Sequence, residues 1–301
     1  MFLVSGPDLV IAACLNGVIG SLPCANARSP EILEEWISAI SSALANPERD
    51  QERVAPCAIN LVVHPTNSRL SVELDILERA RVPLVITALG GPRPIIDRVQ
   101  SWGGLVFADV NSVEYAKKAV DAGVDGLVLV SSGAGGHTGR MNGFSFLAAV
   151  REFFNGPVAL GGGLSNGAEI RAVETAGADL AVMGTSFIAT DESLAVPEYK
   201  QLLVDSVMAD LVLTNTVTSV LANWLRPTLI RAGIDPEAFL TNPKVDFTGV
   251  SSPELQKARW KTVWSAGHGV GSVAKVESTA KLISRLREEY RKACTLPVAY
   301  G

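Results

Sequence analysis

The chain has 301 residues, of which 48% are hydrophobic, and its formal net charge is -5 with a pI near 5.4. This length and apolar fraction exclude a disordered or fibrous protein and are sufficient for one large α/β barrel or two medium domains. An acidic chain has no basic stripe that could neutralise a phosphate backbone. The composition therefore argues against a nucleic-acid partner and favours small-molecule chemistry.

The cysteines form no Cys-x-x-Cys pair, and Cys14, Cys24 and Cys57 lie in or beside apolar segments, as buried thiols do. We therefore expect reduced thiols and a cytoplasmic location. No apolar run approaches the roughly 20 residues that span a bilayer, and the N-terminus lacks the basic start and cleavage site of a secretory signal. The sequence predicts a soluble protein with no membrane partner.

Short runs rich in Val, Ile and Leu recur along the first part of the chain and are typical of strands buried on both faces of a sheet. They span residues 17–22, 57–63, 83–89, 104–110, 126–131, 157–161 and 180–184. The segments between them have helical spacing, and those at 112–123 and 166–177 end in Gly, as capped helices do. Alternation every ~20 to 30 residues predicts a TIM (β/α)8 barrel, with a doubly wound open sheet as the alternative.

The two ends of this pattern are irregular. Only residues 1–4 precede the break at Ser5-Gly6-Pro7 and a helix expected over 8–15, so the first strand is apparently shortened. After Lys200 the alternation stops, and prolines interrupt a mostly helical stretch in which Trp224, Trp260 and Trp264 are expected to be core anchors. The predicted regions are a β/α barrel over 1–200, a helical insertion or lid over 201–275, and a final barrel helix with its tail over 276–301.

Glycine-rich segments follow the last three predicted strands. The strongest is Ser131-Ser132-Gly133-Ala134-Gly135-Gly136-His137-Thr138-Gly139, which in a barrel lies on the catalytic face and lets the backbone approach a flat or phosphorylated ligand. The turns at 161–164 and 184–186 follow the next two strands, and backbone N–H groups at such turns form anion sites, often for phosphate. The alternative for the first segment alone is a glycine-rich loop followed by a surface histidine, and the alternative for each turn alone is ordinary turn chemistry.

With these motifs the chain resembles the nitronate monooxygenases, also called 2-nitropropane dioxygenase-like flavoproteins, over nearly its whole length. The segments that carry the resemblance are residues 1–6, Ile59-Asn60-Leu61, Ala134-Gly135-Gly136-His137, Gly162-Gly163-Leu164, Met183-Gly184-Thr185-Ser186-Phe187, Glu192-Ser193, Tyr199-Lys200 and residues 265–271. The chain differs from many members at Gly133 and His268, where they have Glu and Gln, and from some at Asp109, where they have Lys.

The resemblance implies a flavoprotein that binds FMN. The residues that would hold the FMN phosphate, mainly through backbone N–H groups, are Gly162, Gly163, Gly184 and Thr185. Those that would contact or line the rest of the cofactor are Asn60, Gly135 and Gly136. His137 would lie over the reactive face of the ring as a base or as a substrate-orienting group. The implied reaction converts an alkyl nitronate and O2 into a carbonyl compound and nitrite, with no metal.

Histidine suits the role given to His137, because an imidazole with an ordinary pKa near ~6.5 can take a proton beside a nitro group or donate a hydrogen bond to a nitronate. His64, after a predicted strand, and His268, in a glycine-rich loop, are weaker candidates for substrate or lid contacts. Three separated histidines without ligand spacing make a poor metal site. An FMN-dependent NAD(P)H:quinone or enoyl-thioester reductase, and a flavin-holding barrel without turnover, stay open as alternatives, as does assembly into a homo-oligomer.

Overall fold

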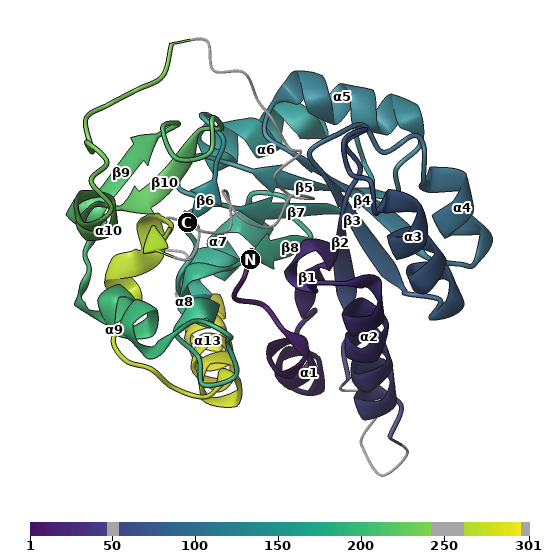
Figure 1. Cartoon of the computed structure of the whole chain (residues 1–301), viewed down its shortest axis with the longest axis horizontal. Coiled ribbons are helices and arrows are strands. Elements are labelled where there is room, and N and C mark those ends of the chain that lie inside the picture. Colours follow the sequence, from purple (N-terminus) through teal and green to yellow (C-terminus); the bar gives the residue numbers. More distant parts are fainter. Residues whose placement is uncertain (47–53, 242–261, 296–301) are drawn as a thin grey trace.

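The computed structural model of the chain describes residues 1–46, 54–241 and 262–295. Seven parallel strands form one curled sheet with helices packed on its outer face (Figure 1). In sheet order these strands are β1 (Ser21–Pro23), β2 (Ala58–Val62), β3 (Leu84–Ala88), β4 (Leu105–Val110), β5 (Gly126–Val130), β7 (Val158–Gly161) and β8 (Leu180–Val182). All seven fall within or beside the runs predicted from the sequence, which confirms the α/β fold class.

The helices alternate with these strands and then continue beyond β8. They are α1 (Pro7–Leu15), α2 (Pro30–Leu44), α3 (Leu70–Arg79), α4 (Ile96–Ser101), α5 (Val113–Ala122), α6 (Gly143–Arg151), α7 (Gly167–Thr175), α8 (Thr185–Ile188), α9 (Pro197–Asp205), α10 (Arg226–Arg231) and α13 (Thr279–Cys294), with short 3-10 turns η1 (Cys24–Asn26), η3 (Met208–Asp210) and η4 (His268–Ser272). The side chains of Ser112 and Asn166 cap α5 and α7 by accepting a hydrogen bond from a first-turn N–H. The helices predicted over 112–123 and 166–177 are therefore present.

Successive residues of a strand face opposite sides of the sheet, so each buried strand contributes to two cores. The outer core joins the sheet to the helices around it. On the inner face, one packed layer consists of Ala58, Leu84, Phe107, Val128 and Ala159, each from a different strand. This apolar layer closes the bottom of the curled sheet, and the residues above it are available to line a site.

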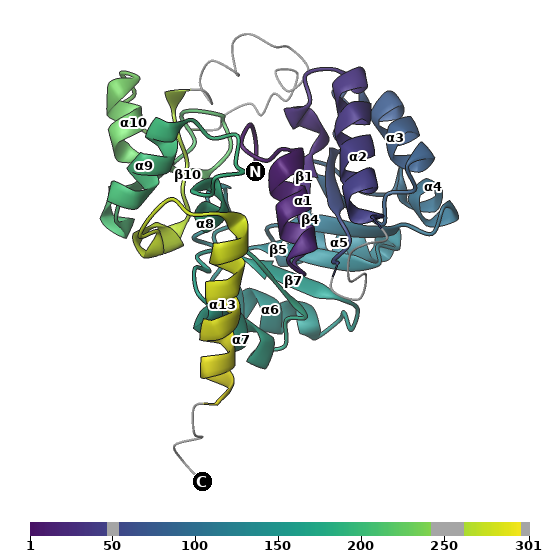
Figure 2. The same cartoon turned by 90° about the horizontal axis from the view of Figure 1, so that it is seen from below.

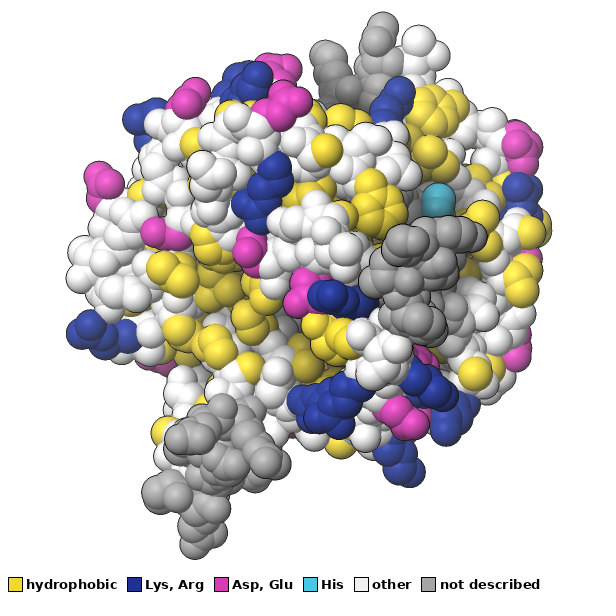
Figure 3. Space-filling view, turned by 180° about the vertical axis from the view of Figure 1, so that it is seen from behind, with side chains coloured by type: hydrophobic (Ala, Val, Ile, Leu, Met, Phe, Trp, Pro, Cys, Tyr) yellow, Lys and Arg dark blue, Asp and Glu magenta, His cyan; other side chains and the backbone are white. Residues whose placement is uncertain are grey.

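The sheet does not close into a barrel within the described residues, because its edge strands β1 and β8 do not pair with each other. Residues 1–4, expected as a shortened first strand, form turns instead. On β8 the side chains of Leu180 and Val182 are 39% and 42% exposed. In the view of Figure 3, hydrophobic side chains gather in a hollow that charged side chains surround. The fold is thus a half-barrel with the strand order of a TIM barrel.

The segment after residue 200 corrects the expectation of a helical insertion. It contains two strands, β9 (Leu211–Thr214) and β10 (Ala222–Leu225), and β10 pairs with both β9 and the short β6 (Gly136–His137) to form an antiparallel sheet. This small sheet and α9 and α10 lie at one end of the molecule, with α3 and α4 at the other (Figures 1 and 2). Residues 242–261 and 296–301 lie outside the described residues, and the division into three regions stays a prediction.

The predictions about thiols and membranes have different outcomes. Cys14, Cys24 and Cys57 are buried free thiols, as expected, and Cys294 is free and exposed. In the described parts of the chain, no helix combines the length and apolar character needed to cross a bilayer. The cytoplasmic location stays a prediction.

Candidate functional site

The curled sheet surrounds a cavity of about 1650 Å³, lined by inward side chains of its strands and by the loops that follow them. Typical small-molecule pockets have volumes of roughly 300–1,000 Å³, so this cavity can hold a ligand of cofactor size. Every residue predicted to be catalytic or cofactor-binding lines it: Asn60, Gly135, Gly136, His137, Gly162, Gly163, Gly184 and Thr185. The fold therefore brings these residues together, and their individual roles stay proposals.

The glycine turns after β7 and β8 lie side by side because the two strands pair, with Gly161 opposite Val182. Gly162 and Gly163 have φ values of 136° and 76°, which favour glycine over any residue with a side chain. The backbone N–H groups of Gly163, Gly184 and Thr185 donate no hydrogen bond to another described residue. Unpaired amides on two adjacent turns form a donor set for an anion such as phosphate.

A third loop, residues 265–269, packs against both the 133–136 segment and Thr185. The N–H of Gly267 donates to Thr185 Oγ1 at 2.8 Å, and the N–H of His268 donates to the carbonyl oxygen of Gly133 at 2.9 Å. A Cβ atom on Gly267 would lie 2.6 Å from the Gly133 oxygen, so only glycine fits there. The rim of the cavity is therefore built by segments that are far apart in the sequence and packed backbone to backbone.

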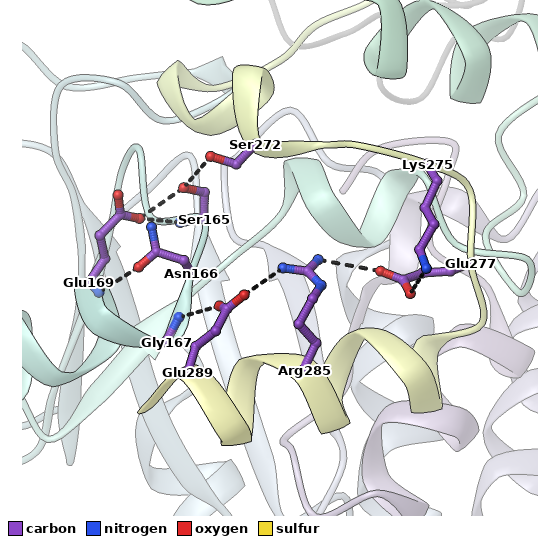
Figure 4. A network of polar contacts seen from close by, with 9 residues as sticks. All are labelled: Ser165, Asn166, Gly167, Glu169, Ser272, Lys275, Glu277, Arg285 and Glu289. Atoms are coloured by element: carbon purple, nitrogen blue, oxygen red, sulfur yellow. Dashed lines mark hydrogen bonds and ion pairs between the residues drawn. The ribbon is translucent and has the colours of Figure 1, made fainter. Parts of the chain in front are cut away.

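Hydrogen bonds hold the turn after β7 against this third loop (Figure 4). Ser165 donates to Glu169 Oε2 from its backbone nitrogen at 2.6 Å and from Oγ at 2.9 Å. Its Oγ also lies 3.1 Å from Ser272 Oγ in η4. These contacts fix the position of the Gly162–Gly163 turn relative to the 265–269 loop.

The same network continues into the last helix, α13 (Figure 4). Glu289 accepts a hydrogen bond from the N–H of Gly167, the first residue of α7, at 2.9 Å. Arg285 pairs with Glu289 at 3.1 Å and with Glu277 at 3.3 Å, and Lys275 pairs with Glu277 at 3.5 Å. The last helix is thereby tied to the start of α7, directly after the glycine turn.

His137 lies on β6 with a half-buried side chain that faces the cavity. Burial lowers the pKa of His137 to about 4, because the surroundings disfavour the charged ring. At neutral pH the imidazole is uncharged and offers one N–H donor and one acceptor nitrogen. Its Nε2 lies 3.4 Å from Thr218 Oγ1, a contact with the segment between β9 and β10 that the sequence did not reveal.

The two weaker histidine candidates are not in the lining of this cavity. His64 lies outside it, and its Nδ1 is 2.8 Å from the hydroxyl of Thr66. His268 lines a neighbouring pocket of about 350 Å³ together with Gly133 and Asn223. Among the residues that the structure describes, no group of three or more His, Cys, Asp or Glu side chains could hold a metal ion.

An aromatic pair that sequence reasoning treated only as core or as part of a motif also lines the cavity. Tyr199 stacks on Trp264 with 4.8 Å between ring centroids, and its hydroxyl donates to the Ser265 carbonyl oxygen at 2.6 Å. Burial raises the pKa of Tyr199 to about 12, so this hydroxyl keeps its proton. Trp224 and Trp264 are buried as expected, whereas Trp260 lies outside the described residues.

Comparison with known proteins gives a consistent set of matches. Residues 1–289 match the model of a family described as nitronate monooxygenase. Among curated relatives, a putative monooxygenase of Mycobacterium tuberculosis is 26% identical over 72% of this chain and 61% of its own length. A carboxyl-CoA dehydrogenase of Rhodococcus jostii is 27% identical over 65% of this chain and 52% of its own length. A probable nitronate monooxygenase of Staphylococcus saprophyticus is 26% identical over 64% of this chain and 59% of its own length.

Solved structures show the same fold over nearly the whole chain. Nitroalkane oxidase from Streptomyces ansochromogenes has a TM-score of 0.79 at 27% identity, covering 97% of this chain and 94% of that one. FabK from Thermotoga maritima has a TM-score of 0.78 at 23% identity, covering 98% of this chain and 91% of that one. The curated relatives named above are longer, since the chain spans only 52% to 61% of their length.

Proposed function

This chain belongs to the nitronate monooxygenase family, a family of flavin-dependent oxidoreductases, and we propose that it binds FMN and oxidises alkyl nitronates to carbonyl compounds and nitrite with O2. The observation that carries the proposal is the convergence of two glycine turns and one uncharged imidazole on a single cavity. The similarity to a probable nitronate monooxygenase and to a nitroalkane oxidase supports the same reaction class.

The residues at the cavity rim fit a flavin mononucleotide. The unpaired N–H groups of Gly163, Gly184 and Thr185 are donors for a dianionic phosphate. The glycines at 135 and 267 let the backbones of two cavity-lining segments pack directly against each other at the rim. Asn60, on the wall formed by β2, offers both a donor and an acceptor to the polar edge of such a ring.

In the proposed reaction, FMN supplies the redox chemistry when it is bound. The role of the protein is to place the nitronate and to exclude water. A nitronate is an anion whose oxygens accept hydrogen bonds, and the uncharged imidazole of His137 can donate one from the nitrogen that carries its proton. Thr218, at 3.4 Å from Nε2, limits rotation of this ring. The stacked Tyr199 and Trp264 add apolar ring surface to the lining of the same cavity.

The test is an absorbance titration of the purified full chain with FMN, followed by anaerobic addition of propyl-2-nitronate. We expect a flavin spectrum that is retained after gel filtration, bleaching by the nitronate, and release of nitrite with O2 consumption when air is admitted. The neutral parent, 2-nitropropane, serves as the comparison substrate. A protein that retains no FMN, or bound FMN that no nitronate reduces, would contradict the proposal.

The second candidate is an FMN-dependent reductase that takes hydride from NAD(P)H and reduces a quinone or an enoyl thioester. The similarity to a carboxyl-CoA dehydrogenase favours it, because that relative acts on a thioester of coenzyme A. Anaerobic bleaching of bound FMN by NADH or NADPH, without bleaching by a nitronate, would select this function. Bound FMN that neither reagent reduces would favour the third alternative, a flavin-holding barrel without turnover.

A further inference from the structure

Two polar side chains interrupt the apolar inner wall formed by the five strands β2, β3, β4, β5 and β7. The floor layer of Ala58, Leu84, Phe107, Val128 and Ala159 contains no polar group. Two residues farther along each strand, the next inward positions are Asn60, Ile86, Asp109, Val130 and Gly161, and all of them line the cavity. Asn60 and Asp109 are therefore the polar groups in a layer that faces the ligand space directly.

Asp109 lies in this layer, and one oxygen of its carboxyl group receives no hydrogen bond from the residues that the structure describes. Its Oδ1 atom is buried and makes no hydrogen bond, which is costly for a carboxylate in apolar surroundings. On β5 the residue opposite Asp109 is Val128, and on β3 the residue after the paired Thr87 is Ala88, and neither side chain offers a donor. A buried polar group that the protein leaves unsatisfied at the wall of a cavity indicates a group that a ligand satisfies.

The charges around Asp109 favour its neutral form. Burial raises the pKa of Asp109 to about 7, and the positive charge of the Met1 amino group opposes that rise. Burial also lowers the pKa of the Met1 amino group to about 6, so this group carries little positive charge at neutral pH. Near pH 6 the carboxyl group of Asp109 is mostly a hydrogen-bond donor.

We propose that Asp109, in its protonated form, donates a hydrogen bond to an acceptor atom of the flavin ring. The inference rests on the proposed flavin site and adds a residue to it. The isoalloxazine ring has two carbonyl oxygens and unprotonated ring nitrogens, which are acceptors for such a donor. The phosphate is not the partner, because its turns follow β7 and β8, whereas Asp109 is on β4, with β5 between β4 and β7. An ionised Asp109 is only an acceptor and could not donate a hydrogen bond to these atoms.

The consequence is a flavin affinity that depends on pH. Above pH 7 the protonated fraction of Asp109 falls, so the affinity of the wild-type chain for FMN should fall by roughly tenfold for each further pH unit. The amide of Asp109→Asn donates a hydrogen bond at every pH, and this variant should bind FMN with little change between pH 6 and 8.5. Asp109→Leu has no donor and should bind about tenfold more weakly than wild type at pH 6.

The experiment measures dissociation constants of FMN and of riboflavin by flavin fluorescence from pH 5.5 to 8.5. Riboflavin lacks the phosphate, whose own ionisation near pH ~6 would otherwise contribute. The Asp109 effect should appear equally with both ligands. Asp97→Asn, an exposed change on α4, is the matched control and should follow wild type. Thermal melting of each variant without flavin shows whether it is folded.

Either of two results overturns the inference: an affinity of Asp109→Asn with the same pH slope as wild type, or wild-type affinity of folded Asp109→Leu at pH 6. Failure of the proposed function looks different. Then the wild-type chain binds no FMN at any pH, and Asp109 has no flavin to contact.

Discussion

Gly135 and Gly267 are in backbone contact, so close that a Cβ atom on Gly135 would lie 2.7 Å from the backbone nitrogen of Gly267. That nitrogen also donates to the hydroxyl of Thr185 at 2.8 Å. The contact therefore joins three segments of the cavity rim, those at 133–136, 184–185 and 265–269. Substitutions at Gly135 and Thr185 therefore test whether this junction sets the shape of the cofactor site.

The change Gly135→Ala should push the 265–269 loop away from the rim. Overpacking of this kind costs about 1–3 kcal/mol, and here the atoms that must move are backbone atoms. We expect a lower melting temperature and a loss of FMN affinity, measured by differential scanning fluorimetry and flavin fluorescence. Gly271→Ala, in the adjoining turn η4, is the matched control, because a Cβ atom there meets nothing within 4 Å. Equal behaviour of the two variants would show that the junction does not shape the site.

The change Thr185→Val keeps the shape of the side chain and removes the oxygen that accepts from Gly267. An N–H left without its partner costs roughly 1–3 kcal/mol when it is buried. We expect weaker FMN binding, by about tenfold, whereas Thr185→Ser keeps the hydroxyl and should bind FMN nearly as wild type does. Isothermal titration of FMN into each variant measures the difference. If Thr185→Val and Thr185→Ser bind FMN with the same affinity, the hydroxyl has no part in positioning the rim.

The sequence predicted the barrel strands well because the central ones are short apolar runs buried on both faces, as at 57–63 and 104–110. It missed β9 and β10, which are four-residue strands in a segment that prolines interrupt. The β-branched residues Val and Thr at 211–220 were a signal that could have revealed β9.

The cavity-lining glycines and His137 were predictable from motifs that follow the strands, since the C-terminal ends of parallel strands meet at one edge. Asp109 was visible only as a departure from some family members. Its unsatisfied carboxyl group depends on what surrounds it in three dimensions. The contact of Tyr199 with Trp264 and Ser265 depends in the same way on a tertiary approach that no local pattern encodes.

The change His137→Asn should leave FMN in place and remove most of the activity with nitronate. The phosphate turns are on other loops, so cofactor affinity should change less than twofold, whereas loss of the group that orients substrate should lower kcat/KM by roughly 100-fold. His64→Asn is the control, because His64 lies outside the cavity and should keep wild-type kinetics. Initial rates of nitrite release measure both variants. Unchanged kinetics in His137→Asn would remove this residue from the proposed mechanism.

His137 should also make the flavin-free protein sensitive to acid. Its pKa is lowered to about 4 in the folded chain, whereas an unfolded chain has an ordinary histidine pKa near ~6.5. Between these values the unfolded chain binds more protons, so the free energy of unfolding falls as the pH falls from about 6.5 to about 4. The size of the loss is on the order of 3 kcal/mol at pH 4.

Removing the imidazole should remove this part of the acid sensitivity. Urea unfolding of wild type and of His137→Asn at pH 7.5 and pH 4.5 gives four free energies, and the loss between the two pH values should be smaller in the variant. His64→Asn again serves as the control, since His64 lies outside the cavity and its variant should lose as much stability as wild type. If His137→Asn and wild type lose the same free energy of unfolding between the two pH values, protonation of the ring does not destabilise the folded chain. The ring would then be better hydrated than its burial indicates.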